Sequence, residues 1–116
     1  MANQETCTWV GISGTKYTYY VYPRHPNIND GQDGNYIYAK KNGDGYWVPV
    51  YMGEGDLSRR ATADHHRIGC IDSKGATHVH LRLNAKYEDR RAEEQDLLAN
   101  YTNALTPYGC NVCPTG

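Results

Sequence analysis

The sequence predicts an α+β domain in which a small, mostly antiparallel three-stranded sheet is flanked by helices and preceded by extra N-terminal strands. Runs rich in β-branched and aromatic residues occur at 17–22, 35–41 and 76–83, and turn-forming residues separate them. Two later segments, 56–66 and 87–103, repeat their apolar residues at helical spacing. Strands interleaved with helices in this order are typical of a small antiparallel sheet packed against helices.

Size and composition indicate one compact soluble domain. The chain has 116 residues, 39% of them hydrophobic, and a net charge of −1. No apolar run approaches the roughly 20 residues that a membrane-spanning helix needs, so no membrane association is expected. Residues 1–5 lack the basic and apolar regions of a secretory signal, and a cytoplasmic location is therefore expected.

The N-terminal part is expected to be an extension of the main domain. Residues 1–22 should form one or two strands, whereas 23–34 contain two prolines, two glycines and several Asn and Asp residues and should form a loop. The expected organisation is therefore a strand extension and loop at 1–34, followed by the main domain at 35–116.

The middle of the chain predicts a β-hairpin. The turn sequence NGDG at 42–45 joins a strand at 35–41 to a partner strand at 46–52. Pro49 removes one backbone donor from the second strand, which predicts a bulge or an edge position there. If the aliphatic side chains of the hairpin cover the core, Tyr38 and Tyr51 emerge together on the other face. Tyrosine pairs across a hairpin are also good cross-strand packing, and the residues alone favour that simpler interpretation.

A helix over 56–66 should begin at Asp56, a suitable N-cap. Arg60 lies at the border of its apolar stripe, where the guanidinium can reach into a groove and bind phosphate. Arg59 points away from the stripe and is expected to be a surface charge that adds affinity for a nucleic-acid backbone. His65 comes near the end of this helix and is a candidate proton carrier.

The last helix, at 87–103, carries an acidic residue on its apolar stripe. Helical spacing puts Glu94 near the middle of the stripe and Glu93 toward its edge. A carboxylate on a buried face is costly unless it is paired or binds a cation. A structural ion pair with Arg90 or Arg60 and a metal-ligand role therefore both stay open.

The four cysteines favour free thiols. Cys110 and Cys113 have the spacing of half a zinc site, but Cys7 and Cys70 lie alone, so zinc binding is a weak third hypothesis. Disulfides are not expected in a reducing compartment.

From about residue 35 to 111 these fragments fall in the order of the GIY-YIG nuclease domain, which the chain resembles. The tripeptide YIY at 36–38 corresponds to the first motif, with tyrosine in place of its leading glycine, and YMG at 51–53 corresponds to the second. LSRR at 57–60 matches the leucine-x-x-arginine of the following helix.

Three later residues continue the resemblance. His65 is the nearest counterpart of the histidine that often follows the arginine helix. Glu94, followed by two leucines, matches the metal-binding glutamate of the family, and Asn111 matches its late asparagine.

The resemblance implies an endonuclease that hydrolyses phosphodiester bonds in DNA. Glu94 would hold Mg²⁺ or Mn²⁺, and the cation and Arg60 would stabilise the charge of the transition state. Tyr38, polarised by Tyr51, would help to remove a proton from the attacking water. The implied catalytic set is Tyr38, Tyr51, Arg60, His65, Glu94 and Asn111.

The DNA would be structured or single-stranded, because the chain balances 12 basic against 13 acidic residues and lacks the basic excess of duplex-binding proteins. Local basic residues would contact it: Lys40, Lys41, Arg59 and Arg67. A protein partner could supply specificity. The alternative is a catalytically inactive module of the same fold that binds nucleic acid or protein, in which Glu94 and Arg60 form a structural pair.

Overall fold

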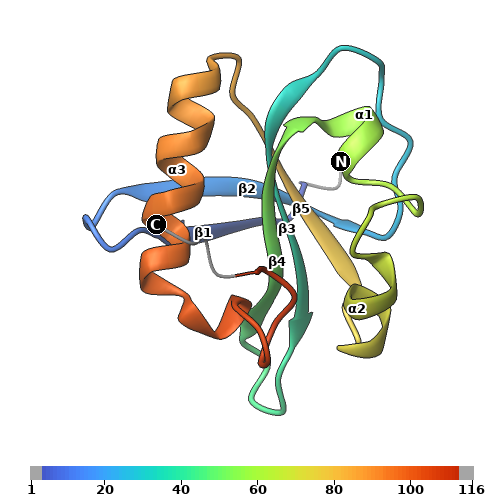
Figure 1. The fold of residues 1–116 in the computed structure, drawn as a ribbon, viewed down its shortest axis with the longest axis vertical. Helices are drawn as coiled ribbons and strands as arrows, with labels where there is room; N and C mark the ends of the chain where they lie inside the picture. The colour runs from blue at the N-terminus through green and yellow to red at the C-terminus, as the bar shows by residue number, and fades with distance from the viewer. Residues whose placement is uncertain (1–3, 113–116) are drawn as a thin grey trace.

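A computed structural model describes residues 4–112 (Figure 1). Five antiparallel strands form one sheet, in the order β1-β2-β5-β3-β4. The strands are β1 (Thr6–Val10), β2 (Lys16–Pro23), β3 (Asp33–Lys41), β4 (Trp47–Asp56) and β5 (His78–Leu83). The helices are α1 (Leu57–Arg60), α2 (Ile68–Ser73) and α3 (Tyr87–Asn100), followed by the 3₁₀ turn η1 (Thr102–Ala104).

The sheet is strongly curled and buries side chains on both faces. In Figure 1, β1 and β2 run across the view while β3 and β4 run nearly upright, with α3 on one side and α1 and α2 on the other. One core cluster includes Ile37, Met52 and Leu97, the last from α3. The second includes Tyr36 and Tyr38 with residues of α1 and α2. Successive residues of β3 therefore enter opposite cores.

The expected three-stranded sheet flanked by helices is wrong, because the sheet has five strands and the helices are few. β2 pairs along β5, with Tyr20 opposite Leu81, so the N-terminal strands extend the sheet itself. Trp9 and Tyr19 are 2% and 1% exposed, so these strands also supply core. This pairing satisfies the backbone groups that β5 would otherwise present at an edge.

The single helix expected at 56–66 is also wrong. α1 ends at Arg60, and α2 begins only at Ile68. Between them, the Thr62 hydroxyl accepts a hydrogen bond from the Asp64 N–H, and Nδ1 of His65 accepts one from the Arg67 N–H at 2.9 Å. Side chains that satisfy nearby backbone donors in this way compete with helix formation.

The irregularity expected at Pro49 is confirmed. The register of β3 and β4 shifts between Tyr38, opposite Tyr51, and Ala39, opposite Pro49, which leaves Val50 as an extra residue. β4 is also an edge strand of the sheet. At a bulge in an edge strand, the missing N–H of proline does not cost the sheet a hydrogen bond.

The expectation of free thiols is wrong for two cysteines. Cys70 in α2 forms a disulfide with Cys110, whereas Cys7 is free. Cys113, the other half of the zinc hypothesis, lies outside the described residues, and the sulfur of Cys110 is already bonded. Within residues 4–112, no group of three or more His, Cys, Asp or Glu side chains is arranged to hold a metal ion. None of the described helices is long and apolar enough to cross a membrane.

Breaking the disulfide should destabilise the protein. Because the bond links residues 40 apart, its loss should lower the free energy of unfolding by about 2–4 kcal/mol. Thermal unfolding with and without reductant measures this. A Cys70→Ala/Cys110→Ala double variant is the control, because reductant should lower the melting temperature of the wild type and leave that of the variant unchanged. Equal sensitivity of both proteins would contradict the pairing.

Candidate functional site

A polar groove runs beside β4, between α1 and α3. It consists of two adjoining pockets of about 290 and 210 Å³, both lined by Tyr51 and Glu94. Arg60 lies at one end, and Arg67 and Asn111 lie at the other. We call this feature the Glu94 groove and define it by Tyr36, Tyr51, Arg60, Arg67, Glu94 and Asn111.

Two glycines at the end of β4 shape the groove. A Cβ atom on Gly53 would lie 2.4 Å from the Tyr36 hydroxyl oxygen, so only glycine lets that phenol lie against the strand. Gly55 has φ +134°, and the Arg60 side chain passes within 3.2 Å of where its Cβ would be. The sequence GEG at 53–55 therefore lets a phenol and a guanidinium approach the backbone closely.

Glu94 is half-buried, and its surroundings disfavour the charged form of its carboxyl group. Its carboxylate forms no ion pair with any residue of 4–112, although Arg60 lines the same pocket. Burial and the nearby Glu54 carboxylate raise its pKa to about 7, against a partial opposing effect of Arg91. An added positive charge would be stabilised here.

The helical-wheel placement of the neighbouring acid is wrong. Glu93, expected at the edge of the stripe, is only 2% exposed. It accepts hydrogen bonds from the Tyr19 hydroxyl, from Nε of Arg82 at 3.0 Å and from Nδ2 of Asn84. Tyr19 lies on β2, Arg82 on β5 and Asn84 just after β5, so two neighbouring strands of the curled sheet supply these donors. Glu93 is therefore the structurally paired acid of the helix, and Glu94 is the acid of the groove.

Arg90, an expected partner for Glu94, is occupied elsewhere. Its Nε lies 3.6 Å from a carboxylate oxygen of Glu54, and its Nη1 donates to the backbone oxygens of Asn84 and Ala85. Glu54 thus has a cationic partner, whereas Glu94 does not.

A hydrogen-bonded relay lies beneath the groove. Because Nδ1 of His65 accepts the Arg67 N–H, the proton of the neutral ring is on Nε2, which donates to the Tyr36 hydroxyl oxygen at 2.7 Å. The ring is neutral at physiological pH, since burial and the nearby positive groups lower the pKa of His65 to about 4. Tyr36 can then donate its own proton to Tyr51.

Tyr51 is the phenol that opens into the groove. Burial and the Glu94 charge raise its pKa, while the hydrogen bond from Tyr36 and the charges of Arg60 and Arg67 lower it. A cation beside Glu94 would cancel the second of the raising effects. The ionisation of Tyr51 is therefore linked to the charge state of Glu94.

Tyr38 is not brought into the groove. Its side chain is fully buried, its hydroxyl donates to the backbone oxygen of Thr62 at 3.2 Å, and it lies 3.0 Å from Nε2 of His25. Tyr36, two residues earlier on the same face of β3, lines the groove instead.

Asn111 has a structural task within the groove. Its side-chain amide accepts a hydrogen bond from the Met52 N–H and donates one to the Met52 carbonyl, each at 2.8 Å. These bonds satisfy the outer edge of β4 and hold the C-terminal segment against it. Arg67 fixes the same segment through a hydrogen bond from Nε to the Cys110 carbonyl.

The basic residues expected to contact DNA divide into two groups. Arg67 lines the groove, and Arg59 projects into solvent from α1 with its side chain 85% exposed. Lys40 and Lys41 instead lie at the turn end of the hairpin. Lys40 donates to the Lys74 carbonyl, and Lys41 covers the Trp47 ring.

Among the lining residues that the sequence did not identify as site residues are Tyr36, Glu54 and Arg91. Arg91 precedes Glu94 by three residues, a spacing that places both on one helix face and could have been read from the sequence. Glu54 follows directly on Gly53, and its closeness to α3 is a tertiary contact without a local signal.

Comparisons with known protein families, with curated proteins and with solved structures find no match to this chain. The resemblance to GIY-YIG nucleases therefore stays a hypothesis that depends on the residues described above.

The stability cost of Glu94 should depend on pH. Below its ordinary pKa of 4.5 the carboxyl is protonated in both the folded and the unfolded protein, and its burial costs little. Above about 7 it is ionised in both states, and the full cost is present. Glu94→Gln should therefore raise the free energy of unfolding at pH 8 by roughly 1–3 kcal/mol, and much less at pH 5.

Denaturant unfolding at the two pH values measures this difference. The exposed Glu88 on the same helix provides the matched control, Glu88→Gln, which should change stability little at either pH. A loss of stability in Glu94→Gln at both pH values would instead identify Glu94 as one half of a structural pair.

Proposed function

We propose that this protein hydrolyses phosphodiester bonds in DNA with the help of a divalent cation. The observation that carries the proposal is the composition of the Glu94 groove. There the Glu94 carboxylate, which has no ion-pair partner within residues 4–112, lies among Arg60, Arg67 and Arg91, next to Tyr51. Arginine forks are suited to phosphate oxygens, and a half-buried carboxylate with no ion-pair partner is suited to a hard cation.

The chemistry of the groove fits Mg²⁺ or Mn²⁺. Glu94 would hold the ion, because its raised pKa reflects a carboxylate that burial and Glu54 leave in need of positive charge. Mg²⁺ commonly uses one or two carboxylates and takes its other ligands from water and phosphate, so a larger cluster of ligating side chains is not required. When bound, such an ion polarises the phosphoryl group and stabilises the charge of the transition state.

Arg60 and Arg67 would position the scissile phosphate. Arg60 lies close to the backbone at Gly55, which limits its freedom, and the hydrogen bond from Arg67 Nε to the Cys110 carbonyl leaves the remaining donors of that guanidinium for a ligand. Preorganised cations of this kind stabilise the negative charge that develops on phosphate oxygens as water attacks.

Tyr51 would take the proton of the attacking water. Burial and the Glu94 charge raise the pKa of Tyr51 above its ordinary value of 10, and the hydrogen bond from Tyr36 and the charges of Arg60 and Arg67 only partly oppose that rise. Positive charge beside Glu94 would remove one of the two raising causes, so Tyr51 would become a stronger candidate base only when a cation is bound. As the new P–O bond forms, the P–O bond to the leaving oxygen breaks, and that oxygen takes a proton from solvent. His65 supports this step indirectly, by donating to Tyr36.

The cellular location is proposed from the disulfide. The Cys70–Cys110 bond, whose Cys110 half is fully buried, favours an oxidising compartment over the reducing cytoplasm that the sequence suggested. Because the groove has few cations beyond its arginines, a protein partner could still deliver the enzyme to its DNA.

The proposal predicts nicking or cleavage of plasmid and single-stranded DNA in the presence of Mg²⁺ or Mn²⁺. Glu94→Gln and Arg60→Ala should each reduce the rate at least a hundredfold, because each removes transition-state stabilisation worth about 3 kcal/mol or more. Glu88→Gln, on the exposed side of α3, is the matched control and should cleave like the wild type.

A second measurement separates an enzyme from an inactive binding module. Millimolar Mg²⁺ should raise the melting temperature of the wild type and leave that of Glu94→Gln unchanged, since ligands that bind only the folded state stabilise it. No cleavage across a broad substrate panel, together with no effect of Mg²⁺ on stability, would leave only the binding module.

A further inference from the structure

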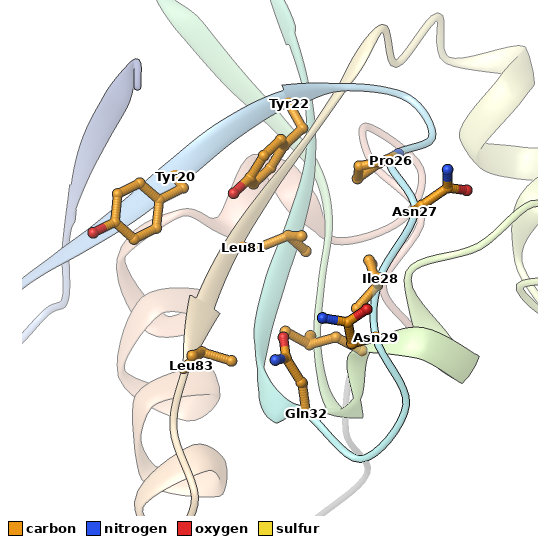
Figure 2. A pocket seen from close by; sticks show the side chains of 10 residues that line it. Tyr20, Tyr22, Pro26, Asn27, Ile28, Asn29, Gln32, Leu81 and Leu83 are labelled. Carbon is orange, nitrogen blue, oxygen red and sulfur yellow. The ribbon is translucent and has the colours of Figure 1, made fainter. Parts of the chain in front are cut away.

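A second pocket lies on the other side of α1 from the Glu94 groove. It has a volume of about 240 Å³ and opens between strands β2 and β5 and the loop at 24–32. Figure 2 shows side chains of both strands and of the loop gathered around this space. Its polar lining consists of two phenols and three carboxamides, from Tyr20, Tyr22, Asn27, Asn29 and Gln32.

These polar side chains are free to receive a ligand. None of these five side chains forms a hydrogen bond with another group within residues 4–112, so their donors and acceptors face solvent. Between them lie aliphatic surfaces, from Ile28, Leu81 and Leu83. Leu83 and Tyr20 are 64% and 52% exposed, so apolar surface is left open to solvent here.

The lining selects an uncharged planar ligand. No charged side chain of the described residues lines the pocket, and Asp30 on the same loop is exposed and would repel a phosphate. An aromatic face stacks on a planar ring, while carboxamides donate and accept hydrogen bonds along its edge. Unpaired nucleobases are recognised by this combination. The pocket is smaller than the roughly 300 Å³ at which sites for drug-sized ligands begin, which suits a single base.

The position of the pocket relates it to the groove. Leu57, the first residue of α1, lines the pocket, and Arg60, three residues later on the same helix, lines the groove. Three residues correspond to about 4.5 Å along the helix axis, a little less than one turn. Arg59 lies between them in sequence, and its exposed guanidinium is available to a phosphate.

We propose that the pocket bounded by Tyr20, Tyr22 and the loop at 24–32 holds an unpaired base of the same DNA strand whose phosphodiester lies at Arg60. The inference rests on the proposed hydrolase, whose substrate class it narrows to DNA with unpaired bases. A paired base cannot enter, because its hydrogen-bonding edge is already occupied by the opposite strand. Single-stranded or gapped DNA should therefore bind better than a continuous duplex.

Binding is tested separately from catalysis, with Glu94→Gln protein in the presence of EDTA. Fluorescence anisotropy compares three labelled probes of equal length: a single strand, the same strand with abasic sites, and the duplex. The normal single strand should bind about tenfold more tightly than the abasic strand, because stacking of a base on an aromatic side chain contributes that order of affinity. Equal affinity for the two strands would overturn the inference.

Substitutions then locate the base. Tyr20→Val, in the same protein, should weaken binding of the normal strand about tenfold and leave the abasic strand unchanged, because only the normal strand stacks on this ring. Tyr46→Val is the matched control, since Tyr46 is 72% exposed in the hairpin turn, away from the pocket. Asn29→Ala, in the exposed loop, provides a second variant with little effect on folding. If neither Tyr20→Val nor Asn29→Ala weakens binding of the normal strand, the assignment of the pocket is wrong.

The two proposals fail in different ways. Base-dependent binding without any cleavage by the wild type would contradict the proposed hydrolase and support the base-binding pocket. If DNA is cleaved and the KM changes neither with Tyr20→Val nor with removal of the bases, the base-binding pocket is contradicted and the proposed hydrolase is supported. The last experiment uses NMR to follow the binding of free nucleosides through the Tyr20 signals. If a nucleoside saturates these signals but does not compete with the single strand for binding, the placement of the strand is wrong.

Discussion

The half-buried carboxylate of Glu94 on α3, which forms no ion pair with the described part of the chain, is the constraint on which the candidate site depends. Burial and the Glu54 charge raise its pKa, and its own charge in turn raises the pKa of Tyr51. Whatever lowers the energy of this carboxylate therefore also changes the ionisation of the phenol beside it. This linkage gives a cation two effects, a direct one on the carboxylate and an indirect one on Tyr51.

The architecture of the sheet explains why this acid is unpaired while its neighbour is not. The N-terminal strands continue the sheet past β5, so that Tyr19 of β2 joins Arg82 of β5 beside α3, where both donate hydrogen bonds to Glu93. Glu94, one residue on, points about 100° away, toward the edge strand β4. There the glycines at 53 and 55 leave room for a phenol and a guanidinium but provide no direct contact to the carboxylate.

Local sequence was sufficient for the parts of the fold that local interactions stabilise. The hairpin, its irregularity at Pro49 and the start of the last helix could all be predicted, because turn residues, proline and apolar periodicity act within a few positions. The break after Arg60 could not be read from periodicity, since local side-chain hydrogen bonds outweighed it. The pairing of β2 with β5 joins residues about sixty positions apart and has no local signal.

By itself, the sequence determined which chemical groups are available and roughly which element carries each of them. It placed Tyr51, Arg60 and Glu94 on a strand and two helices, and these three residues do line one pocket. Only the tertiary structure decided that Tyr36 lines this pocket and Tyr38 does not, that Glu93 is the paired acid, and that Cys70 meets Cys110. Each of those outcomes depends on which distant segment lies opposite a side chain, and that is set by the long-range packing of a curled five-stranded sheet.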